Sequence, residues 1–75
     1  MTTNWNIILD DSPRNIRLAK NFALGNLSGS EFYSYFTNTE AGGEVRSLLR
    51  NGGVNRARQL TRKALNRRMI EVTAN

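Results

Sequence analysis

A helical stripe of apolar and small residues in the second half of the chain restricts the fold more than any other feature. Between positions 54 and 65, these residues recur at the i, i+3, i+4 and i+7 spacing of one helix face. The stripe consists of Val54, Ala57, Leu60, Thr61, Ala64 and Leu65. Ile70 would fall on the polar side, so we expect the helix to end near Arg68 or Met69. Other elements must cover the stripe, which predicts a fold built on helix packing.

The chain has 75 residues and contains neither cysteine nor histidine. No disulfide and no thiolate metal site can stabilise it, so helix packing or self-association has to do so. We therefore expect one mostly α domain over residues 1–75, made of three to four short helices. The longest apolar run, Ile7–Leu9, is too short to cross a membrane, and the N-terminus does not resemble a signal peptide. An intracellular location is the default expectation.

Local signals predict three more helices before the basic one. Ser12 or Asp11 suits an N-cap, and Pro13 suits the first helical position of a helix that runs to about residue 24. Ser28 and Glu31 have the spacing of a capping box, which predicts the start of a second helix. A third short helix is expected over about residues 43–50, between two Gly-Gly pairs.

Both ends of the chain carry short segments with the character of strands. Residues 5–9 are rich in β-forming side chains, and residues 69–73 alternate between apolar and polar. We expect two short terminal strands, which would pair with each other or across a homodimer, because a lone two-stranded ribbon is weak.

Positive charge is concentrated in the second half of the chain. Residues 1–37 carry equal numbers of acids and bases, whereas residues 38–75 carry the whole net charge of +5. Between Arg46 and Arg68 there are bases but no acid. This asymmetry indicates an anionic partner for the second half.

The polar side of the long helix carries only bases and amides. Its members are Asn55, Arg56, Arg58, Gln59, Arg62, Lys63, Asn66 and Arg67, and Arg46 and Arg50 would extend the patch from the preceding helix. Arginine and lysine neutralise phosphates, and asparagine and glutamine hydrogen-bond to bases or backbone. The sequence therefore predicts a nucleic-acid-binding module. Its alternative is a solvated arginine-rich face, relieved by acids that fold back from the first half.

The same charges also suit an acidic protein surface. In that alternative the chain is a small adaptor, inhibitor or other regulator, and apolar anchors such as Tyr33, Leu48 or Leu49 fix the complex. We single out Tyr33 as a partner contact because Phe32 and Phe36, on the other side of their helix, are expected in the core. A further alternative is a minor structural subunit whose terminal strands complete a neighbouring sheet.

Catalysis is not expected. Without histidine or cysteine, no set of residues meets the requirement for a nucleophile, a base and a group that orients them. Asp10 and Asp11 are the only adjacent carboxylates, and a strand end and helix cap account for them. We expect no cofactor and no metal ion. Membrane binding is not expected either, because the stripe of the basic helix offers little apolar bulk for insertion.

Overall fold

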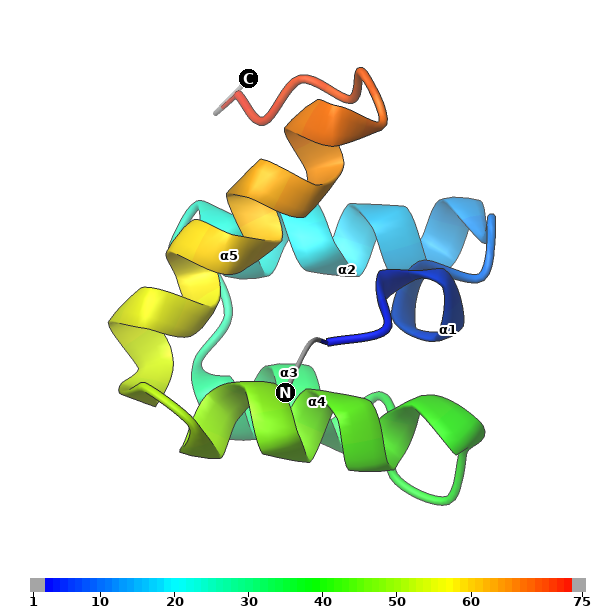
Figure 1. Cartoon of the computed structure of the whole chain (residues 1–75), viewed down its shortest axis with the longest axis vertical. Helices are drawn as coiled ribbons and strands as arrows, with labels where there is room; N and C mark the ends of the chain where they lie inside the picture. Colours follow the sequence, from blue (N-terminus) through cyan, green and yellow to red (C-terminus); the bar gives the residue numbers. More distant parts are fainter. Residues whose placement is uncertain (1–2, 74–75) are drawn as a thin grey trace.

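The computed structural model describes residues 3–73, and within this range the chain forms helices but no strand (Figure 1). The helices are α1 (Trp5–Leu9), α2 (Pro13–Ala23), α3 (Gly29–Ser34), α4 (Glu40–Arg50) and α5 (Gly53–Arg67). The prediction of a small, mostly α domain is confirmed. The described part holds five helices instead of three to four, because the N-terminal segment is also helical. No helix within residues 3–73 has the length and apolar content needed to cross a membrane.

Helix α5 packs most extensively on α2, which it crosses obliquely (Figure 1). Helix α4 also contacts α5, and α1 packs against both α4 and α2. Helix α3 connects the two sides of the molecule through contacts with α2 and α4. The apolar stripe of α5 is thus covered over most of its length, with Ala57, Thr61, Ala64 and Leu65 all buried. Leu60 is partly buried, and Val54, at the start of the helix, is exposed, which corrects the prediction at that end.

Two of the predicted helix starts are present in detail. The Ser12 hydroxyl accepts a hydrogen bond from the Asn15 N–H at 3.3 Å, directly before Pro13. At α3, the Ser28 hydroxyl accepts from the Glu31 N–H at 3.0 Å, and the Glu31 carboxylate accepts from the Ser28 N–H at 2.9 Å. This reciprocal capping box satisfies two donors that the first turn of a helix leaves free.

The predicted strand over residues 5–9 is wrong, because this segment is helix α1. Asn4 caps the helix, with its side chain accepting from the Ile7 N–H. The helical turn places Trp5, Ile8 and Leu9 on one face, at the i, i+3 and i+4 spacing, and Ile8 and Leu9 are fully buried. Tertiary burial here outweighs the β propensity of the segment.

The expected C-terminal strand is also not formed, at least over residues 70–73, which have no regular structure. Helix α5 ends in a Schellman motif, in which the Ile70 N–H bonds to Leu65 O and the Met69 N–H bonds to Asn66 O. The motif turns Ile70 back toward the core, and Val72 is buried beyond it. The alternating burial predicted for this segment is real, but the segment packs on helices. The terminal strand pairing that the homodimer and subunit hypotheses use is therefore not present in residues 3–73.

Helix α4 begins at Glu40, three residues before the predicted start, so the pair Gly42–Gly43 lies inside the helix. A Cβ atom at position 42 would lie 2.7 Å from the carbonyl oxygen of Phe36. Only glycine permits this close approach between α4 and the turn that follows α3. The glycine that reads as a helix break in the sequence is therefore a packing contact.

A chain of aromatic rings forms the centre of the core. The rings of Phe22 and Phe32 stack in parallel with centroids 4.3 Å apart, and Phe36 meets Phe32 edge-on at 5.1 Å. All three are essentially inaccessible to solvent, which confirms the core prediction for Phe32 and Phe36. Their contacts tie α2 to α3 and to the turn that leads into α4.

Candidate functional site

The polar side of α5 lies at the surface along the whole helix. We call seven of its residues the α5 basic face: Asn55, Arg56, Gln59, Arg62, Lys63, Asn66 and Arg67. All seven are exposed, and the buried stripe lies on the opposite side of the helix. The structure therefore brings these predicted site residues together on one continuous surface.

Arg58, the eighth predicted residue of this helix, is used within the fold. Its guanidinium lies over the ring of Phe22, with Cζ 4.7 Å from the ring centroid. One of its terminal nitrogens donates to the carbonyl oxygens of Phe22 and Leu27, the latter at 2.9 Å. These carbonyls lie at and beyond the C-terminal end of α2, where a cation is favourable. Arg58 is only partly exposed, so we leave it out of the α5 basic face.

Two other arginines of this region hold the chain ends in place. Arg62 donates to the carbonyl oxygen of Val72 at 3.4 Å. Arg68, which the sequence analysis did not select, donates to the side-chain oxygen of Asn6 in α1. Both side chains are exposed, so their guanidinium groups keep donors that face solvent.

The carboxylates that make hydrogen bonds do so with backbone N–H groups. Glu44 accepts from the Asn4 N–H at 2.9 Å, next to α1, and Glu31 is engaged in its capping box. Among the hydrogen bonds of residues 3–73, none joins a base of α5 to a carboxylate. Within the described residues, hydrogen bonds to acids therefore do not provide the relief that the solvated-face alternative considers.

Arg46 and Arg50 line a hollow whose lining includes no residue of the α5 basic face. The hollow has a volume of about 360 Å³, and Tyr33, Leu49 and Val54 also line it. The hollow groups these two arginines with Tyr33, the predicted partner contact, and that they extend the basic patch stays a prediction. Leu48, the other apolar anchor considered, is only 3% exposed and belongs to the core.

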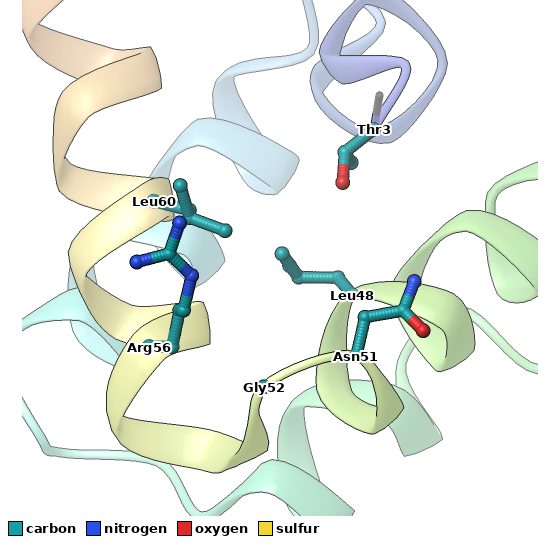
Figure 2. A pocket seen from close by; sticks show the side chains of 6 residues that line it. All are labelled: Thr3, Leu48, Asn51, Gly52, Arg56 and Leu60. Carbon is teal, nitrogen blue, oxygen red and sulfur yellow. The ribbon is translucent and has the colours of Figure 1, made fainter. Parts of the chain in front are cut away.

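A second pocket lies where α4 turns into α5. Figure 2 shows Arg56 and Leu60 of α5 facing Leu48 of α4, with Asn51 and Gly52 in the turn and Thr3 on the far side. The pocket encloses about 450 Å³, and Arg56 is the one charged residue that lines it. It continues the α5 basic face toward the N-terminal segment.

Comparison of the chain with protein-family models, with curated proteins and with solved structures found no match. No group of acidic residues within positions 3–73 is arranged to hold a metal ion.

Proposed function

We propose that the chain is a non-enzymatic nucleic-acid-binding module that contacts the phosphate backbone through the α5 basic face. The observation that carries the proposal is an exposed helix face of four bases and three amides with no acid in it. From Asn55 to Arg67 this face spans about 18 Å of helix axis. Duplex DNA carries a phosphate charge about every 1.7 Å along its axis, so several phosphates come within reach of such a helix.

The amides support the same proposal. The side chains of Asn55, Gln59 and Asn66 alternate with the bases along the helix, and all three are exposed. Amide side chains can hydrogen-bond to base edges, to sugars and to phosphates, whereas lysine and arginine provide charge. A face that carries both kinds of side chain can bind the phosphates through its bases and make additional hydrogen bonds to the nucleic acid through its amides.

Repulsion within the face also favours an anionic partner. Lys63 and Arg67 are one helical turn apart and both exposed, and a like-charge pair at this spacing costs about 0.2–0.5 kcal/mol. Binding of phosphates removes this cost.

Fluorescence anisotropy with labelled duplex DNA, single-stranded DNA and RNA tests the proposal. With four bases at the interface, the slope of log affinity against log salt should be about −3 to −4 for duplex DNA. Affinity should thus fall roughly 100-fold between 50 and 200 mM salt. Failure to bind any of the three nucleic acids at the lower salt concentration contradicts the proposal.

The matched variants are Lys63→Glu on the α5 basic face and Arg17→Glu on α2. Both positions are exposed, make no side-chain hydrogen bond within the described residues, and change the net charge equally. Lys63→Glu should weaken binding by roughly tenfold or more, and Arg17→Glu by much less, because local contacts outweigh net charge at this salt range. Equal losses in the two variants would mean that net charge alone drives binding and would refute the α5 basic face as the site.

A further inference from the structure

The hollow between α3, α4 and the start of α5 is separate from the α5 basic face. We call it the α3–α4 hollow, and its lining includes Tyr33 from α3, Arg46, Leu49 and Arg50 from α4, and Val54 from α5. Its volume of about 360 Å³ is at the low end of ligand pockets and suits one or two side chains of a partner.

The floor of the hollow is apolar and well packed. Gly29 supplies backbone without a side chain, and a Cβ there would lie 3.4 Å from Leu49 Cδ2 and 3.6 Å from Val54 Cγ2. Leu49 and Tyr33 are half-buried against the core, and Val54 is 39% exposed. Three helices thus contribute partly exposed apolar side chains to one contiguous patch. Such a patch indicates an interaction site, whereas apolar residues scattered singly over a surface do not.

The rim of the hollow is positively charged. Arg46 and Arg50 are one helical turn apart on α4, both are exposed, and neither donates a hydrogen bond from its side chain within the described residues. No acidic residue lines the hollow. Arginine stems can extend the apolar floor while their guanidinium groups remain free to bind carboxylates in a bidentate manner.

We propose that the α3–α4 hollow docks an acidic segment of a partner protein, which places an apolar side chain on Leu49 and Val54 and carboxylates on Arg46 and Arg50. Charge complementarity argues for an acidic occupant. The apolar floor argues for protein over nucleic acid, because base edges placed there would lose hydrogen bonds with water without replacing them. The proposal does not depend on nucleic-acid binding by the α5 basic face.

The test uses the full chain, labelled with ¹⁵N, and a synthetic peptide of three glutamates, Leu-Phe and three glutamates. Amide signals of Tyr33, Leu49, Arg50 and Val54 should shift on titration, and those of Lys63 and Arg67 should not. A peptide with Ser-Ser in place of Leu-Phe and a peptide with lysines in place of glutamates should each bind at least about tenfold more weakly, since each lacks one half of the recognition.

Two double charge-reversal variants distinguish peptide binding at the hollow from non-specific attraction of an acidic peptide to a basic protein. The double variant Arg46→Glu/Arg50→Glu should weaken peptide binding by roughly tenfold or more. The control Lys63→Glu/Arg67→Glu has the same change in charge at exposed positions and should weaken it by about threefold at most. Val54→Glu should also weaken it, and it should fold because an acid in the first turn of a helix is favourable. The folding of each variant is read from its amide spectrum.

Four outcomes of the peptide experiments overturn the proposal. The first is no binding at about 1 mM peptide, a dissociation constant that corresponds to a binding free energy of about −4 kcal/mol. The second is equal binding of the Ser-Ser peptide, and the third is amide shifts centred on the α5 basic face. The fourth is an equal loss of affinity in the two double variants. A single-stranded oligonucleotide that shifts the same signals at lower concentration than the peptide would also overturn it, and would make the hollow a nucleic-acid site.

Discussion

The guanidinium of Arg58 in α5 caps the aromatic stack of the core by lying over the ring of Phe22 in α2, with its Cζ 4.7 Å from the ring centroid. The same side chain donates hydrogen bonds to the Phe22 and Leu27 carbonyls. One arginine therefore joins the C-terminal end of α2 to α5, the most extensive helix–helix contact of the fold. A residue that looks like a phosphate ligand in the sequence stabilises the fold instead.

Replacement of Arg58 should therefore cost stability. We expect Arg58→Ala to lower the free energy of unfolding by about 2–4 kcal/mol, since it removes charge-assisted hydrogen bonds and a cation–π contact. Arg58→Lys should recover little, because an ammonium group cannot stack on Phe22 and reach both carbonyls. Urea denaturation followed by circular dichroism measures the change. The control Arg56→Ala, at an exposed position, should stay within about 0.5 kcal/mol; similar losses in both variants would contradict the structural role of Arg58.

Met69 occupies a position of the Schellman motif that suits glycine. Its φ of 61° is in the left-handed region, as is the φ of 87° at Gly25, which ends α2 with the same hydrogen-bond pattern. Met69→Gly should stabilise the protein by about 0.5–1 kcal/mol, because it relieves the backbone cost of a side chain at positive φ. Thermal unfolding measures the gain. Met69→Ala should give no comparable gain; an equal gain would point to loss of the exposed side chain as the cause.

The adjacent glycines of α4 should respond to alanine in opposite directions. Gly42→Ala should destabilise the protein by about 1–3 kcal/mol, because its Cβ would lie 2.7 Å from the Phe36 carbonyl oxygen. Gly43→Ala should stabilise by about 0.5–1 kcal/mol, because a Cβ there meets nothing within 4 Å and alanine favours the helix. Denaturant midpoints of the two variants provide the comparison. A loss of stability in Gly43→Ala would contradict the packing of α4 described above.

Lys63→Glu should separate stability from binding. The new glutamate would stand four residues before Arg67 on an exposed helix face, and this orientation of an ion pair stabilises a helix by about 0.3–0.5 kcal/mol. The same change should weaken nucleic-acid binding, as argued for the α5 basic face. Parallel measurement of thermal unfolding and of anisotropy checks both effects. If the variant lost stability, its weaker binding could be attributed to unfolding, and Lys63→Gln would then serve as the neutral replacement.

The parts of the fold that local chemistry determines could be predicted from the sequence. The starts of α2 and α3 were expected because their signals act within a few residues. These signals are the capping hydrogen bonds of Ser12 and of the pair Ser28/Glu31, and the fixed φ angle of Pro13. The stripe of α5 was predictable for the same reason, because helical periodicity is a local property.

The parts that depend on distant residues could not be predicted. The segment at residues 5–9 is helical because its side chains are buried against α2 and α4, and nothing within the segment shows this. The one local signal for a helix start lies just before the segment, at Asn4, whose side chain caps the helix by accepting from the Ile7 N–H.

Arg58 shows the same limit for the candidate site. Helical periodicity gives the direction of a side chain but not its neighbours, so all bases on the polar side looked equivalent. The available signal was position: Arg58 is four residues after Val54, at the edge of the apolar stripe, where long side chains can reach the core boundary. The grouping of Arg46 and Arg50 with Tyr33 depends on how α3 and α4 pack, which periodicity cannot show.

The exposure of Met69 has a practical consequence. Its side chain is 94% exposed two residues after Arg67, the last base of α5, and it is the one methionine within residues 3–73. An accessible thioether is converted to the sulfoxide by mild oxidants, and a bound partner that shields the sulfur slows that reaction. The rate of oxidation at this single sulfur atom is therefore a label-free reporter, readable by mass spectrometry, of whether anything rests on the C-terminal end of the α5 basic face.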